Sequence, residues 1–386
     1  MNSPKLDADV LVVGAGLAGL SAATRLQAAE LEVKVVERAS AVSAAGAGIM
    51  LHPNALRILD DAVYSRLRRL GAEIRRQVSV DPGGSYSYVE WRSVWCTDQL
   101  PLAVHRLVLA NVLLDQLERG TVSWATVPLR LAMREDSVEV MFTDGTSGRY
   151  RLVVGADGIH SWTRQFIDRT ARPVHLGQIY WRTVADAALW PEREDEWRTW
   201  RGPGGSFFGL MPIGSGRIHL FLQMPAAMMP SDWHGERADA QAVVAHASAV
   251  SAEAGDLASA VRESTFDVRP AYRLDCKRWA RDRLVLVGDA SHAVSPATTQ
   301  GGALAIEDAA VLADEVERWG PCPAALTAFE QRRRRRVSDF LRLASFHIAL
   351  MEALAATATT RSGPDTSERD VAPWFRRIYR PLMTPA

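Results

Sequence analysis

The segment VLVVGAGLAGLSAATRL, residues 10–26, decides the fold of this 386-residue chain. An apolar, β-branched strand runs directly into Gly14, Gly16 and Gly19, and a helix of small residues follows. Gly14 permits a tight turn, Gly16 lets the backbone approach a pyrophosphate, and Gly19 lets the helix pack against its strand. The amides at the start of such a helix direct partial positive charge at phosphates. The segment therefore predicts a parallel α/β sheet that binds a dinucleotide.

A second strand, VKVVE at residues 33–37, ends on Glu37. It lies roughly 20 residues beyond the glycines, where an acidic side chain accepts hydrogen bonds from ribose hydroxyls. The same carboxylate would repel a phosphate on that ribose. The glycine motif and Glu37 alone leave a NAD-dependent dehydrogenase and a flavoprotein both open.

Three further segments separate these two classes. They are GDASHAVSPATTQGGALAIED at residues 288–308, VVGADGIHSWTR at residues 153–164, and HRLVLANVLLDQL at residues 105–117. In order and content, the four motifs together resemble the class A flavoprotein monooxygenases, the family of p-hydroxybenzoate and salicylate hydroxylases, from about Asp9 to Arg336. The stretches GAGIMLHPNALRIL (46–59) and QGGALAIEDA (300–309) are most similar to the subgroup of salicylate, urate and kynurenine hydroxylases and zeaxanthin epoxidase.

The resemblance implies non-covalent FAD. Position by position, it places Asp289 on the ribityl or pyrophosphate part, Arg106 on the pyrophosphate side and Val127 beside the adenine. The family commonly shows GQGxN in its last loop, whereas Thr299 and Ala303 stand here for the first Gly and the Asn. The expected cofactor-binding residues are Gly14, Gly16, Leu17, Ala18, Gly19, Glu37, Arg38, Gly48, Ile49, Arg106, Val127, Asp157, Asp289, Pro296, Gly301, Gly302 and Ala303.

The resemblance also implies the reaction. NAD(P)H, bound transiently because no second nicotinamide domain is visible, reduces FAD, and O2 adds to give a flavin C4a-hydroperoxide. Its distal oxygen then hydroxylates or epoxidises an aromatic or electron-rich small molecule. Such transfer needs a pocket that excludes water.

The implied fold is α/β, a Rossmann-like FAD-binding domain of the p-hydroxybenzoate hydroxylase type with an inserted, mostly antiparallel β-sheet and C-terminal helices. The insert is predicted from aromatic strands such as GQIYWRTV and RIHLFLQM, which alternate with Gly and Pro turns. The expected boundaries are 1–73, 101–173 and 271–345 for the FAD-binding domain, 74–100 and 174–270 for the substrate domain, and 346–386 for a C-terminal helical tail.

The inserted sheet is expected to select the substrate. Side chains alternate along a strand, so Tyr180 and Arg182 share one face of theirs, as His219 and Phe221 do. Arg182, His219 and Tyr180 are the polar candidates for orienting or deprotonating a substrate. His219 equally fits a histidine that is satisfied within the sheet, and Arg106 a solvated helix charge. The expected apolar pocket consists of Phe208 (or its neighbour Phe207), Met211, Phe221 and Met224.

Composition excludes several other classes. A formal net charge of zero gives no sign of nucleic acid as a partner. Cys96, Cys276 and Cys322 show no CxxC spacing, which indicates neither a metal site nor a disulfide framework and favours the cytoplasm. No apolar run reaches the ~20 residues that a membrane span needs. The run Arg332–Arg336 lies on an expected helix and is interpreted as structural or solvated.

Other functions remain open at this point. A flavin reductase or dehydrogenase would use the same FAD site without oxygen insertion, and a non-catalytic flavoprotein would share the fold. A halogenase is disfavoured because its WxWxIP signature is absent and Lys5, Lys34 and Lys277 are the only lysines. Of the 45 Lys and Arg residues all others are Arg, which suggests a GC-rich genome and secondary metabolism. We expect a monomer or a homodimer.

Overall fold

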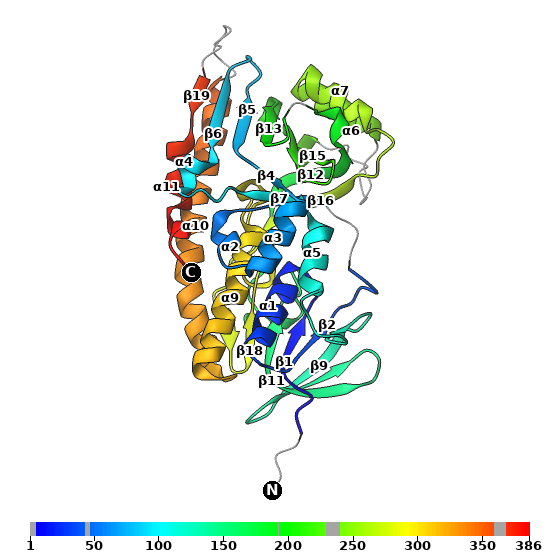
Figure 1. Cartoon of the computed structure of the whole chain (residues 1–386), viewed down its shortest axis with the longest axis vertical. Coiled ribbons are helices and arrows are strands. Elements are labelled where there is room, and N and C mark those ends of the chain that lie inside the picture. The colour runs from blue at the N-terminus through cyan, green and yellow to red at the C-terminus, as the bar shows by residue number, and fades with distance from the viewer. Residues whose placement is uncertain (1–4, 43–46, 192, 229–239, 359–367) are drawn as a thin grey trace.

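The structure is a computed structural model that describes residues 5–42, 47–191, 193–228, 240–358 and 368–386, with the side chains of residues 346–358 excepted. Two large sheets form separate ends of the molecule, and a long helix runs along one side past both of them (Figure 1). The prediction of an α/β fold with an inserted, mostly antiparallel sheet and C-terminal helices is confirmed.

The first sheet is built around the N-terminal strand. Its order is β17-β18-β11-β1-β2-β8, with β10 paired to β11 and β9 paired to β10. The pairs β1–β2, β1–β11 and β11–β18 are parallel, whereas β10 and β11 form an antiparallel hairpin. The continuous apolar runs at residues 10–13 and 33–37 predict parallel strands, and the TDG turn at residues 143–145 predicts the hairpin; both predictions are confirmed. The strands are β1 Ala8–Val13, β2 Val33–Val36, β8 Val122–Ser123, β9 Pro128–Met133, β10 Val138–Phe142, β11 Ser147–Gly155, β17 Ala280–Arg281 and β18 Leu284–Leu286.

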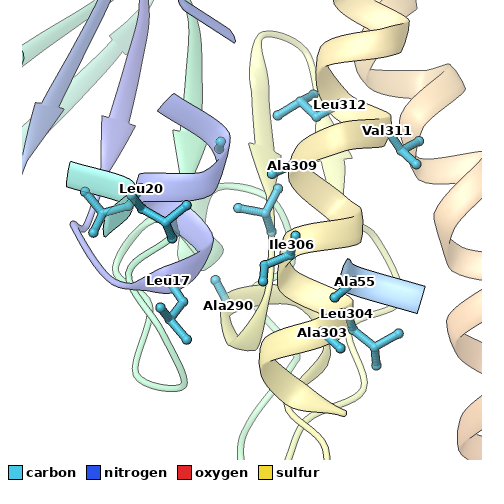
Figure 2. Close-up of a cluster of buried hydrophobic side chains, with 14 of the residues drawn as sticks. Leu17, Leu20, Ala55, Ala290, Ala303, Leu304, Ile306, Ala309, Val311 and Leu312 are labelled. Atoms are coloured by element: carbon cyan, nitrogen blue, oxygen red, sulfur yellow. The ribbon is translucent and has the colours of Figure 1, made fainter. Parts of the chain in front are cut away.

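Helix α1 (Leu17–Ala28) follows the glycine turn and packs against α9 (Gly301–Trp319) and α5 (Arg106–Leu114). In Figure 2, Leu17 and Leu20 of α1 point toward Ile306 of α9, with Ala290 near the point where the two helices approach. Leu20 is fully buried, as are Ala290 and Ala309. This packing holds the starts of α1 and α9, two segments almost three hundred residues apart, in one region of the molecule.

The second sheet has the order β16-β12-β15-β14-β13-β5-β6-β19, antiparallel except for the pairs β13–β5 and β19–β6. One face packs on α6 (Ala240–Val250) and α7 (Ala252–Ala260), two helices where the sequence led us to expect strands and turns. The strands are β5 Arg76–Val80, β6 Tyr86–Glu90, β12 Val174–Asp186, β13 Glu196–Arg201, β14 Phe207–Pro212, β15 Arg217–Pro225, β16 Asp267–Arg273 and β19 Glu368–Asp370.

A three-stranded sheet lies where the two ends of the molecule meet. It consists of β3 (Gly48–Leu51), β7 (Leu102–His105) and β4 (Ala72–Glu73). The spacing of Leu56, Leu59, Val63, Leu67 and Leu70 predicts a single helix over residues 54–70, and this prediction is wrong. The structure has two helices there, α2 (Pro53–Leu56) and α3 (Asp61–Leu70). Asp60 interrupts them because its backbone is extended, with φ −64° and ψ 146°, as befits the residue before a helix.

The C-terminal helices cover one flank of the molecule. Helix α10 (Pro323–Ala358) packs on α9, and α11 (Ala372–Met383) packs on α10 and on α4 (Trp91–Trp95). The short helix α8 (Asp289–His292) follows β18. Gly46 and residues 359–367, both included in the sequence predictions, lie outside the described residues, and the domain boundaries stay a prediction. In the part of the chain that is described, no helix is long and apolar enough to cross a membrane.

Candidate functional site

A cavity of about 1360 Å³ is lined from both ends of the molecule. The glycine-rich turn, Arg106 and the segment around Asp289 line one part of it. The face of the second sheet that is turned away from α6 and α7 lines the other part. Pockets for single small molecules usually measure about 300–1,000 Å³, so this cavity has room for more than one ligand.

The glycines at the start of α1 each have a geometric reason. Gly14 has φ +104°, and a Cβ there would lie 2.6 Å from the carbonyl oxygen of Ala156. A Cβ on Gly19 would lie 1.8 Å from the carbonyl oxygen of Gly14, so only glycine lets α1 sit this close to its turn. A Cβ on Gly16 would meet nothing within 4 Å, and Gly16 lines the cavity. The open space beside this helix start fits a pyrophosphate.

Glu37 does not line the cavity. Its Oε2 accepts a 2.7 Å hydrogen bond from the amide of Ala15, and its Oε1 accepts one of 2.9 Å from the amide of Ala39. The carboxylate thus holds the glycine turn in place, and it retains acceptor sites for a ribose because each oxygen has two lone pairs. Arg38, the next residue, does line the cavity.

Arg106 and Asp289 face the cavity from different elements. Arg106 is the first residue of α5, and Asp289 is the first residue of α8. Enclosure by protein raises the pKa of Asp289, and the positive charges of His292 and Arg106 oppose that rise. Arg106 is thus near enough to influence Asp289, so this part of the wall offers both a cation and a carboxyl acceptor to a phosphate-and-polyol ligand.

The start of α9 contributes a second set of amides. Gly301 and Gly302 line the cavity, together with Pro296 and Thr299 before them. No side chain caps this helix start, so its first amides are available to a ligand that carries negative charge. Ala303 does not reach the cavity: it is fully buried in the core that α9 forms with α1.

Two other expected cofactor residues have different surroundings. Asp157 lines the cavity, but its carboxylate accepts hydrogen bonds from the Ser161 hydroxyl and, at 2.9 Å, from the amide of Thr163. It therefore shapes the turn after β11. Val127 is 37% exposed at the start of the β9 strand and does not line the cavity.

The second sheet presents an aromatic surface to the cavity. The Phe221 ring occupies the space above Gly209, where a Cβ would lie 2.3 Å from Cζ of Phe221. His219 stacks on Phe221 with ring centroids 5.3 Å apart, and Phe207 meets it edge-on at 5.8 Å. The residues of this face that line the cavity include Tyr180, Arg182, Trp197, Thr199, Arg201, Phe207, Met211, His219, Phe221 and Gln223.

The polar residues of this face are mostly paired within the sheet. Arg182 donates to Asp267 at 2.7 Å, and the Tyr180 hydroxyl donates to Oε1 of Gln223. His219 Nδ1 lies 3.3 Å from the carbonyl oxygen of Thr183, which can only accept, so Nδ1 carries the proton. Burial, together with the charge of Arg182, lowers the pKa of His219 to about 3. The imidazole is therefore neutral near pH 7, with Nε2 as an acceptor.

The assignment of Phe208 to the pocket is wrong, and so is that of Met224, which is buried in the core against α6 and α7. Strand alternation turns Phe208 to the opposite face, where it is buried with Trp200 against α6 and α7, and its neighbour Phe207 lines the cavity instead. Gly48 and Ile49 line the cavity as expected, and a Cβ on Gly48 would lie 2.7 Å from Cβ of His219. Gly48 therefore brings the glycine-turn end of the cavity into contact with the sheet.

Sequence reasoning missed one wall altogether. Val371, Trp374 and Phe375, at the start of α11, line the cavity. It also missed Trp197, which the alternation in EWRTWR (196–201) would have placed on the same face as Thr199 and Arg201. The helical spacing of α11 predicts a helix, but nothing in its sequence shows which surface it covers.

Comparisons with known proteins agree with this geometry. The family model described as FAD binding domain matches residues 7–344. A Klebsiella pneumoniae FAD-dependent urate hydroxylase is 30% identical over 342 residues, which cover 86% of this chain and 87% of that protein. A 3-amino-4-hydroxybenzoate 2-monooxygenase of Streptomyces cremeus is 30% identical, over 94% of this chain and 91% of that protein. The crystal structure of Klebsiella pneumoniae HpxO complexed with FAD and uric acid is 26% identical, with a TM-score of 0.82 and coverage of 98% of this chain and 97% of that one.

Proposed function

The chain belongs to the FAD binding domain family, as a class A flavoprotein monooxygenase, and from that premise we propose how its cavity is divided. FAD lies along the starts of α1, α5 and α9, and a small electron-rich aromatic substrate lies against the aromatic face of the second sheet. The observation that carries this proposal is the continuity of the cavity. One continuous space joins the glycine turn to Tyr180, His219 and Phe221.

The residues at the FAD end fit the charges of the cofactor. The α1 start and the open space at Gly16 would take the pyrophosphate, with Arg106 beside it. The first amides of α9, at Gly301 and Gly302, would face the ring system and stabilise negative charge on it. When bound, FAD supplies the redox chemistry of the family: it accepts electrons from NAD(P)H and activates O2.

The residues at the substrate end exclude water and orient a ring. Phe207, Phe221 and Met211 form an apolar wall on one side, and Phe375 of α11 faces the same cavity. Such a wall keeps water from the reacting atoms, which oxygen transfer requires. Stacking against aromatic side chains favours a flat ligand.

His219 and Arg182 would provide the polar contacts. Nε2 of His219 can accept a hydrogen bond from a ring hydroxyl or amino group, because Nδ1 already donates to Thr183. The positive charge of Arg182, which is paired with Asp267, would stabilise negative charge on a substrate oxygen that lies beside it. A ring bearing a hydroxyl or amino group, as in the relatives that act on urate and 3-amino-4-hydroxybenzoate, matches these contacts.

Oxygen labelling tests this function. The purified holoenzyme is mixed with NADH or NADPH under ¹⁸O2, with and without urate, 3-amino-4-hydroxybenzoate and related hydroxylated or aminated rings. We expect one ring to accelerate NAD(P)H oxidation and to gain one ¹⁸O atom. Acceleration with no ¹⁸O in the product, whether the product gains an unlabelled oxygen or none, would instead identify a reductase or dehydrogenase that shares the FAD site.

A further inference from the structure

The loop at residues 295–302 contains a residue in an unfavourable backbone conformation. Thr299, at the position where the family resemblance led us to expect glycine, has φ +51° and ψ 19°. A residue with a Cβ pays conformational free energy to adopt this left-handed geometry, and a β-branched one pays more. Thr299 also lines the cavity directly before the start of α9. Some interaction must therefore keep this loop in place.

His52 supplies the first such interaction. Its Nε2 lies 2.8 Å from Oγ1 of Thr299, and the Thr299 hydroxyl lies 2.8 Å from the carbonyl oxygen of Thr298. Because that carbonyl can only accept, a consistent set of donors runs from His52 Nε2–H to the Thr299 hydroxyl and on to Thr298. His52 has no exposed surface and packs against Trp91 and Trp95, so its position is set by its neighbours.

Tyr379 of α11 supplies the second. Its buried hydroxyl donates to the same carbonyl oxygen of Thr298, at 3.1 Å. The Tyr379 ring stacks on Trp95 at 5.2 Å and lies 5.1 Å from the ring of His52. His52, which directly precedes α2, and Tyr379 of α11 thus approach the Thr298–Thr299 peptide from two sides within one aromatic cluster.

The end of α11 is itself anchored to the helix that follows the loop. Arg336 donates to the carbonyl oxygens of Pro381 and Leu382 and forms two hydrogen bonds with Glu307 of α9. Arg57 donates to the carbonyls of Leu382 and Met383, at 2.9 and 2.7 Å. These hydrogen bonds fix the position of α11, and with it that of Tyr379, relative to α9.

We propose that Tyr379 and His52 are positioning residues that hold the left-handed Thr298–Thr299 turn, and through it the first amides of α9, in register with the flavin ring. This assignment rests on the proposed placement of the ring against this loop. Helix α11 lies beyond residues 7–344, which the family model covers, and the start of the same helix lines the cavity through Phe375. Phe375 and Tyr379 are four residues apart and share one face of α11. This helix therefore contacts both the substrate end of the cavity and the loop at residues 295–302.

The test combines Tyr379→Phe, His52→Gln and Thr299→Gly, singly and in pairs. Glycine adopts a positive φ without a conformational cost, so in Thr299→Gly the turn no longer depends on Tyr379 and His52. We expect Tyr379→Phe and His52→Gln each to raise the Kd for FAD about three- to tenfold, as for a lost buried hydrogen bond. We also expect them to shift the visible spectrum and midpoint potential of the bound flavin and to lower product formed per NAD(P)H. When Tyr379→Phe or His52→Gln is combined with Thr299→Gly, the Kd for FAD, the spectrum, the midpoint potential and the product formed per NAD(P)H should approach the values of Thr299→Gly alone.

Tyr150→Phe is the matched control, because Tyr150 is equally buried but lies in β11, outside the cavity wall. If Tyr379→Phe changes only the thermal midpoint, as Tyr150→Phe does, with flavin spectrum, potential and FAD affinity unchanged, the proposal is overturned. It is also overturned if Thr299→Gly gives no relief. FAD binding and the spectrum are read without turnover, so these outcomes are distinct from a wild-type protein that binds no FAD, which would remove the proposed function itself.

Discussion

The guanidinium of Arg333 lies 2.8 Å from the carboxylate of Asp308, from Nε to Oδ1, and neither side chain has any exposed surface. Arg333 also contacts Glu307 at 2.6 Å. Asp308 in turn accepts a 2.8 Å hydrogen bond from the amide of Gly288, the residue before Asp289. Arg333, the second arginine of the run, is thus a buried structural cation that ties α10 to α9 and to the segment that precedes Asp289, in line with the structural interpretation of that run.

Replacing Arg333 should severely destabilise the fold. Arg333→Gln leaves two buried carboxylates short of their cation, a change that typically costs about 3–5 kcal/mol. We expect this loss in the free energy of unfolding measured with urea. Arg334→Gln is the control, because Arg334 is 45% exposed and makes one 3.4 Å pair with Glu330. That change should stay within about 0.5 kcal/mol of the wild type; equal losses for both variants would contradict the argument.

Stability should fall as the pH drops below about 6.5, the ordinary pKa of histidine in an unfolded chain. Burial lowers the pKa of His52 and of His219 to about 3. Between the two values the unfolded state binds more protons than the folded state, so the stabilisation is fully present above pH 6.5 and is lost toward pH 3. Each histidine contributes a slope of up to about 1.4 kcal/mol per pH unit.

Urea unfolding between pH 7 and 5 measures that slope. His219→Gln should reduce the slope of stability against pH by the contribution of about one proton. The control is the same substitution at the exposed His175. A slope that is the same in His219→Gln as in the wild type would show that burial does not lower the pKa of His219 in the folded protein. Glu307 and Asp308 do not contribute to the slope between pH 7 and 5. Burial raises their pKa values, but the adjacent cations more than offset it and hold both below the ordinary carboxyl range.

The nucleotide end of the site was predictable because backbone geometry demands particular residues there. Gly14 is required by its positive φ, and Gly19 by the close contact between its helix and the turn. Requirements of this kind can be inferred from the positions of glycines in a sequence. Val127 and Ala303 do not line the cavity, and their expected contacts with FAD stay a prediction.

The substrate end was less predictable because both faces of the second sheet are covered. One face packs on α6 and α7 and the other lines the cavity, so apolar residues occur on both. In SFFGLMP, alternation alone cannot tell Phe207 from Phe208. The alanine-rich residues 240–260 do carry a helix signal, which the neighbouring aromatic strands obscured. The α11 wall depends on contacts made across almost the whole chain, which no local pattern shows.

Gly16 and Gly19 allow a paired test of the FAD end. A Cβ on Gly16 enters open space, so Gly16→Ala should leave the stability of the FAD-free protein nearly unchanged. It should weaken FAD binding by about 1–3 kcal/mol, the range for overpacking a close contact, when measured by flavin fluorescence. Gly19→Ala places its Cβ against the carbonyl of Gly14 and should destabilise the fold even without FAD. Unchanged FAD affinity in Gly16→Ala would show that the pyrophosphate lies elsewhere.

Phe207 and Phe208 allow the matching test of the substrate end, since consecutive residues of β14 face opposite sides of the sheet. Phe207→Ala removes part of the cavity wall from a partly exposed position and should raise KM and uncouple NAD(P)H oxidation from product formation, with a small effect on stability. Phe208→Ala opens a hole in the core beside Trp200 and should cost about 3–5 kcal/mol of stability. At a temperature where that variant is still folded, its KM and coupling should match the wild type. The reverse assignment, with substrate kinetics changed by Phe208→Ala and not by Phe207→Ala, would mean that the substrate binds on the α6–α7 side of the sheet.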